Sequence, residues 1–174
     1  GIALFPNRTA FNYVIVAVEI EDGLILLEKK KKYALPNILP VRDLNWFGRL
    51  IREGGSSAEV DLMPKLLSKR VHNIAYGITE SGTIEGKIRK QLTDYEALDF
   101  RISKLNLTKE SYLEDLENKH NALEISDYVR ENDQEISKPV IESYTFKDNG
   151  DVEIINGKMY ISPMLYLVGR ENPF

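Results

Sequence analysis

The first part of the chain is apolar at nearly every position and predicts a β-hairpin. Residues 11–20 are rich in β-branched and aromatic side chains, Glu21-Asp22-Gly23 forms a turn signal, and residues 24–27 return as a second apolar strand. Apolar residues on both sides of a strand are typical of a strand that is covered on both faces. We therefore expect this hairpin to need neighbours, either from downstream residues or from further chain upstream, because the sequence reads as a segment of a longer protein.

Two further hairpins are predicted after a proline-containing connector. Pro36 and Pro40 remove backbone donors, so the connector is extended and gives the best internal boundary. The segments WFGRLIRE and AEVDL flank the turn GGSS, and RVHNIAYGIT and TIEGKIRKQL flank Glu80-Ser81-Gly82. In the first strand of the latter pair the residues alternate, and His72 belongs to the more apolar set.

The hydrophobic period changes between about residues 93 and 119. Apolar residues there recur every three or four positions, which predicts two short helices, with Thr108 as a plausible N-cap of the second. Strands then resume in LEISDYVRE, PVIESYTFKD, DVEII and KMYIS, and the last three are separated by Asn-Gly turns. The expected fold is mainly β (α+β): an antiparallel β-sandwich over residues 44–174 with a helical insertion near 93–119, preceded by the hairpin and connector of residues 1–43.

Composition excludes several classes of site. The chain has 174 residues, a formal net charge of -4 and no cysteine. The charge supplies no overall attraction to nucleic acid, and the missing cysteine excludes disulfides, thiolate metal sites and a cysteine nucleophile in this chain. No stretch reaches the roughly 20 apolar residues that cross a bilayer. We expect no nucleic-acid partner, no membrane span and no cofactor.

The conspicuous polar motifs favour structural roles. The run Lys29 to Lys32 is most simply a solvated strand end, although its role stays open. His72 and His120 have no cysteine or acidic cluster at a metal-ligand spacing, so we predict no metal site. The segment from Asp148 to Asp151 is similar to the start of a calcium loop, but it lacks the remaining ligands and is better explained as a turn.

Six tyrosines offer a second kind of site. They could line a face that binds sugar or peptide, whereas half-buried phenols in strands are common in any sandwich, and packing is the favoured interpretation. The six are Tyr95, Tyr112, Tyr128, Tyr144, Tyr160 and Tyr166.

Tyr13 and Glu28 are the remaining candidates. Tyr13 lies near the start of the first strand and Glu28 at the end of the second, so a tight hairpin brings them together. A phenol and a carboxylate side by side can form an acid/base pair or a structural hydrogen bond.

The hairpin FNYVIVAVE…LLEKKKKY resembles the last part of a transglutaminase-like (papain-superfamily) core. In that family the first strand begins His-x-x-V and the second ends Leu-Asp-x-Thr; the histidine is the general base for a cysteine thiolate and the aspartate orients it. Here Tyr13 occupies the place of the histidine and Glu28 that of the aspartate. Segments such as PNILPVRDLNWFGRLIRE and VEIINGKMYISPMLYL resemble the β-rich C-terminal region of large bacterial proteins with such a core.

The resemblance implies a degenerate site, because a phenol with a pKa near 10 is a poor base near neutrality. We therefore expect a non-catalytic accessory or interaction domain whose partner is the upstream core, with a protein or glycan ligand as a further possibility. Two alternatives stay open: a fragment of a cysteine-dependent enzyme with its nucleophile upstream, and a carbohydrate-binding sandwich that uses the tyrosines. The resemblance also implies a periplasmic or cell-surface location.

Overall fold

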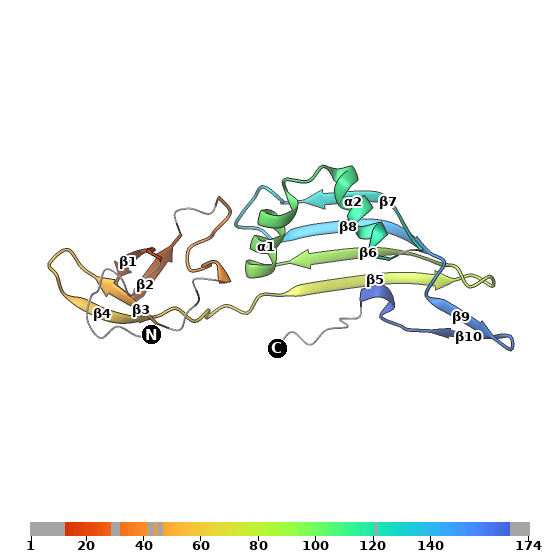
Figure 1. The fold of residues 1–174 in the computed structure, drawn as a ribbon, viewed down its shortest axis with the longest axis horizontal. Helices are drawn as coiled ribbons and strands as arrows, with labels where there is room; N and C mark the ends of the chain where they lie inside the picture. Colours follow the sequence, from red (N-terminus) through yellow and green to blue (C-terminus); the bar gives the residue numbers. More distant parts are fainter. Residues whose placement is uncertain (1–12, 29–31, 42–43, 45–46, 121, 168–174) are drawn as a thin grey trace.

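The fold was obtained as a computed structural model, which describes residues 13–28, 32–41, 44, 47–120 and 122–167. The chain forms ten strands and two α-helices in these residues (Figure 1). All strand pairs are antiparallel, so the predicted mainly β, α+β class with antiparallel sheets is confirmed.

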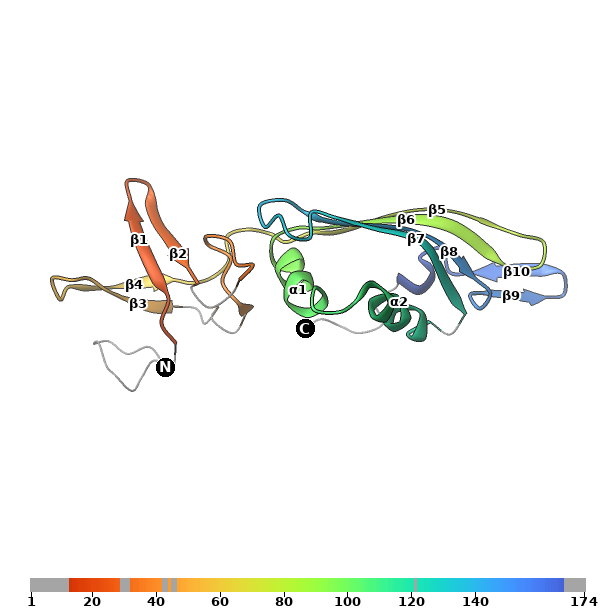
Figure 2. The ribbon, with the colours of Figure 1, turned by 90° about the horizontal axis from the view of Figure 1, so that it is seen from above.

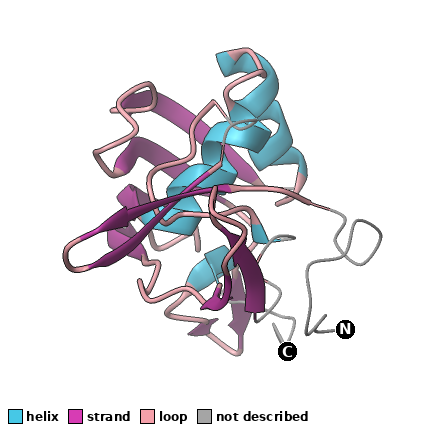
Figure 3. Cartoon of the chain, turned by 90° about the vertical axis from the view of Figure 1, so that its left-hand side faces the viewer, coloured by secondary structure: helices cyan, strands magenta, loops and turns pink. Residues whose placement is uncertain are grey.

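Two separate hairpins lie at one end of the molecule (Figure 1). Strands β1 (Val16–Ile20) and β2 (Gly23–Leu27) pair across the predicted turn, with Val16 opposite Leu27. Strands β3 (Phe47–Ile51) and β4 (Ser57–Asp61) form the second predicted hairpin. Each pair is a two-stranded sheet of its own. Figure 3 shows these hairpins in front of the α-helices.

A four-stranded sheet with the order β5-β6-β8-β7 forms the other part of the molecule. Its strands are β5 (Arg70–Ile78), β6 (Ile84–Leu92), β7 (Leu123–Glu131) and β8 (Val140–Asp148). The predicted third hairpin is β5–β6. A short final hairpin, β9 (Val152–Ile155) and β10 (Lys158–Ile161), extends from the end of the sheet, and the 3-10 helix η2 (Leu165–Leu167) follows.

The helices form a second layer on one face of this sheet (Figure 2). Helices α1 (Asp94–Lys104) and α2 (Lys109–Asn118) lie within the predicted segment 93–119. Thr108 is the N-cap of α2, as predicted, and its side chain accepts a hydrogen bond from the Ser111 N–H. The fold is therefore sandwich-like, with one β layer and one α layer. No helix in the described part of the chain is long and apolar enough to span a bilayer.

The core lies between these two layers. Alternate residues of the two central strands are buried there, because the even-numbered side chains of β6 and β8 point toward the helices. They pack against Phe100 of α1 and Tyr112 of α2. The buried strand residues of this core are Ile84, Ile88, Leu92, Leu123, Tyr128, Val140, Tyr144 and Phe146.

Arg101 fixes the loop between β7 and β8 to helix α1. Its side chain is almost fully buried, and its guanidinium donates to the backbone carbonyls of Asn132, Asp133, Glu135 and Lys138 at 2.8–3.0 Å. Five guanidinium N–H donors suit such a cluster of acceptors. The connector after β2 packs nearby: Ile38 and Leu39 are buried, and Tyr33, Leu35 and Ile38 line a small pocket together with Arg101 and other residues of α1 and of that loop.

Candidate functional site

Tyr13 and Glu28 meet at the open end of the first hairpin. Because Val16 pairs with Leu27, Glu28 lies opposite Ile15, and Tyr13 lies two residues farther along on the same face. The Tyr13 hydroxyl donates a hydrogen bond to the Glu28 carboxylate, and both side chains are partly buried. The phenol-to-carboxylate contact expected from the hairpin register is present.

This pair does not supply the chemistry of a thiol enzyme. The chain has no cysteine, so it cannot itself provide a thiolate nucleophile. Tyr13 donates its hydroxyl proton to the Glu28 carboxylate, so the phenol does not act as a proton acceptor in this arrangement. What the arrangement does physically is to join the ends of β1 and β2 with a charge-assisted hydrogen bond.

Comparisons with protein-family models, curated proteins and solved structures found no match for this chain. The transglutaminase-like origin therefore stays a prediction, as do the domain boundary near residue 43 and the periplasmic or cell-surface location.

The most unusual surface of the hairpin is one face of β1. Val14, Val16, Val18 and Ile20 alternate along it and are 88%, 50%, 41% and 48% exposed. Ile25 and Leu27 of β2 pair with Val18 and Val16, so they share this face. We call these six residues the apolar hairpin face. The sequence predicted that both faces of the hairpin are covered; within the described residues this face is not.

Polar contacts tie the opposite face of the hairpin and the outer edge of β2 to the rest of the molecule. Arg52, just after β3, donates to the Glu19 carboxylate through Nε at 3.0 Å and Nη2 at 2.6 Å. This hydrogen bond, with the charge of Arg52, lowers the pKa of Glu19. Asn37 of the connector exchanges two hydrogen bonds with the Leu26 backbone, each 2.8 Å long. These contacts orient the hairpin relative to β3 and the connector.

The other candidate residues from the sequence, where the structure describes them, make turn or packing contacts. The Asp148 side chain accepts the Gly150 N–H at 2.7 Å, which is a turn contact and confirms that interpretation. The His120 ring packs against Tyr166 with centroids 4.8 Å apart. No group of three or more metal-binding side chains occurs among the residues that the structure describes. Lys29, Lys30 and Lys31 lie outside the described residues, and Lys32 lies over the Tyr33 ring.

Three of the six tyrosines belong to the core, as the packing interpretation predicted. Tyr112, Tyr128 and Tyr144 are buried, and the Tyr128 hydroxyl donates to Glu142 at 2.6 Å. Burial, and after it the charge of Glu142, raises the pKa of Tyr112 and of Tyr128. A buried phenol cannot stack on a ligand at the surface. Tyr160, on β10, is the exposed member of the six.

Sequence reasoning missed the burial of Glu142 and of Arg101. Glu142 shares the face of Val140, Tyr144 and Phe146, so strand alternation could have placed it in the core beside Lys90, its cross-strand neighbour. Arg101 follows Ala97 by four residues, which is the spacing of one buried helical stripe. In both cases the periodicity of the element indicates a buried position, but the charge of the residue favours an exposed one.

Proposed function

We propose that this chain is a non-catalytic accessory domain that binds a transglutaminase-like core through its apolar hairpin face. The observation that carries the proposal is the row of exposed β-branched side chains from Val14 to Ile20. A two-stranded hairpin is marginally stable by itself, and contiguous apolar surface on a folded protein marks a contact site. The occupant follows from the resemblance of this hairpin to the last strands of such a core.

The Tyr13–Glu28 contact supports the non-catalytic part of the proposal. In the family, the first position holds the histidine that serves the cysteine as general base, and the second holds the aspartate that orients this histidine. Here they form a phenol-to-carboxylate hydrogen bond that closes the strand ends. The purified chain should therefore show no hydrolysis or transamidation of glutamine substrates above buffer. Activity that disappears specifically in Tyr13→Phe or Glu28→Gln would contradict a non-catalytic role.

Site-specific photocrosslinking in the source cells tests the binding part. A benzophenone side chain would replace Val16 on the apolar hairpin face or, as the matched control, Val129 on β7; the two valines are 50% and 52% exposed. We expect the Val16 probe to form an adduct with a transglutaminase-like core, within the same polypeptide or on a partner, and the Val129 probe to form none. The proposal fails if Val16 gives no adduct, if both probes give it equally, or if the adduct lacks such a core.

A further inference from the structure

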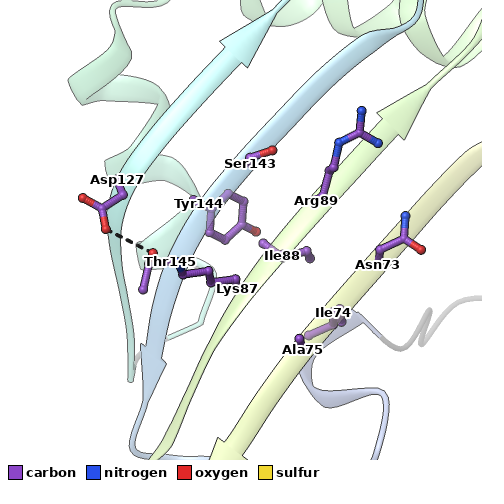
Figure 4. Close-up of a pocket in the computed structure, with 10 residues that line it drawn as sticks. All are labelled: Asn73, Ile74, Ala75, Lys87, Ile88, Arg89, Asp127, Ser143, Tyr144 and Thr145. Carbon is purple, nitrogen blue, oxygen red and sulfur yellow. Dashed lines mark hydrogen bonds between the residues drawn. The ribbon is translucent and has the colours of Figure 1, made fainter.

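The face of the four-stranded sheet opposite the helices carries a groove of about 650 Å³ (Figure 4). Its floor is formed by the middle of β5, β6 and β8. Ile74, Ile88 and Tyr144 lie along this floor, but their side chains belong to the core on the other side. The side chains on the groove side come from the alternate, odd-numbered positions.

Two positively charged side chains lie in the centre of the groove, each between two shorter side chains. Lys87 lies between Ala75 and Thr145 across the strands, and Arg89 lies between Asn73 and Ser143. The short neighbours leave space on both sides of β6. Among the described residues neither cation forms a salt bridge, in contrast to Lys147, farther along the same face, which pairs with Glu85 at 3.6 Å.

A β-bulge in β7 adds an acceptor to the edge of the groove. The pairing shifts between Ser126 and Val129, so β7 has an extra residue there, and Asp127 has φ +51°. Bulges re-aim side chains and are frequent beside binding sites. The Asp127 carboxylate accepts a hydrogen bond from the Thr145 hydroxyl at 3.1 Å and has free lone pairs beyond it (Figure 4).

We propose that this groove binds a saccharide that carries carboxylate groups, such as a uronic-acid polymer. Arg89 and Lys87 provide the charge complement for the carboxylates, and a guanidinium binds a carboxylate through two parallel hydrogen bonds. Asn73, Ser143 and Asp127 supply the mixture of donors and acceptors that sugar hydroxyls need. Among the residues that line the groove, the side chains on this side are polar, charged or alanine, unlike the large apolar anchors that dominate protein–protein contacts, which favours a sugar over an acidic peptide. This site is separate from the apolar hairpin face and does not depend on the proposed function.

Calorimetric titration of the full chain with hexagalacturonate tests the proposal, with maltohexaose as the neutral sugar and hexaglutamate as the acidic peptide. We expect hexagalacturonate to bind in the micromolar to millimolar range and the other two to bind at least about tenfold more weakly. Arg89→Gln should weaken the binding about tenfold, while Lys147→Gln, an equal charge change on the same face, should alter it less than about twofold. An unchanged amide NMR spectrum away from residue 89 would show that Arg89→Gln is folded.

Asp127→Asn distinguishes specific recognition of the sugar from simple attraction of negative charge. Asparagine tolerates the same positive φ, so the bulge should be kept. If Asp127 accepts sugar hydroxyls, loss of its charge should weaken hexagalacturonate binding several-fold; if the groove only attracts negative charge, the same change should strengthen it. Strengthened binding in Asp127→Asn, equal binding of hexaglutamate, no effect of Arg89→Gln, or no binding of hexagalacturonate would each overturn the proposal.

Discussion

Strands β1 and β6 have similar apolar residues on one face, yet their surroundings differ completely. In β1 the side chains of Val16, Val18 and Ile20 are about half exposed, whereas in β6 Ile84 and Ile88 are fully buried. Strand β6 lies in the centre of a four-stranded sheet beneath two helices, while β1 has a single neighbour. The local sequence thus specifies strand pairing in both hairpins. Whether the apolar face of a strand is buried depends on whether another part of a protein packs against it.

The sheet region and the hairpin region as wholes also differ in how many apolar residues they bury. Residues 70–167 share one continuous core of sheet, helices and η2. Within residues 13–67 the buried apolar residues that the structure describes are Ile38, Leu39 and Pro40, and all three lie in the connector. The sheet region therefore has a core of its own, whereas the hairpins have apolar surface available for a partner.

Matched isoleucine truncations should show this difference most strongly. Ile88→Ala removes a buried side chain from the core and should lower the free energy of unfolding by about 2–5 kcal/mol. Ile20→Ala, on the half-exposed hairpin face, should change it by about 0.5 kcal/mol or less. Urea unfolding followed by far-UV circular dichroism measures both. Equal losses would mean that the hairpin has a core of its own.

Arg101 should also matter far more than an arginine of the hairpin region. Arg101→Met leaves four backbone carbonyls without their donor and should lower the free energy of unfolding by about 2–3 kcal/mol. Arg52→Met removes only the exposed contact with Glu19 and should leave the unfolding midpoint unchanged. Thermal unfolding of the two variants gives the comparison; a larger shift for Arg52→Met would contradict it.

Much of the fold could be predicted from sequence because its signals are local. The Asn-Gly turns, the period change near residue 93 and the Thr108 cap each depend on a few neighbouring residues, and all agree with the structure. The Tyr13–Glu28 contact could be predicted for the same reason, since a tight turn fixes the register of the hairpin. The groove could not be predicted from the sequence, because it requires the strand order β5-β6-β8-β7 and the bulge at Asp127, which are set by long-range pairing.

A double-mutant cycle on Tyr13 and Glu28 sharpens the account of the hairpin. Both side chains are partly buried, so we expect a coupling energy of about 1 kcal/mol between Tyr13→Phe and Glu28→Gln. The readout is the free energy of local opening of the β1 and β2 amides, because the hairpin need not unfold together with the sheet. Strictly additive losses would show that the two residues are not coupled and that their hydrogen bond does not hold the strand ends together.

His72 should give the sheet region a small sensitivity to acid. Burial, and after it the charges of Lys90 and Arg70, lowers the pKa of His72, and Glu142 and Glu96 oppose this only in part. The unfolded chain therefore binds a proton below about pH 6.5 before the folded chain does, and stability falls as the pH falls through that range. His72→Gln should remove this part of the slope in unfolding measured from pH 7.5 to 5. An identical slope in the variant would contradict the assignment, and we expect the smallest effect of the four because His72 is half-buried.

Amide hydrogen exchange of the chain alone tests the central comparison most directly. If the hairpins lack a core, the amides of β1 and β2 should exchange through local opening that costs about 1–2 kcal/mol, while those of β6 and β8 should exchange only through global unfolding. The contrast should follow strand position and not residue type, since both regions contain valine and isoleucine amides in paired positions. Protection of β1 and β2 equal to that of β6 and β8 would show that the hairpin is already complete, and the partner surface inferred for it would have to be abandoned.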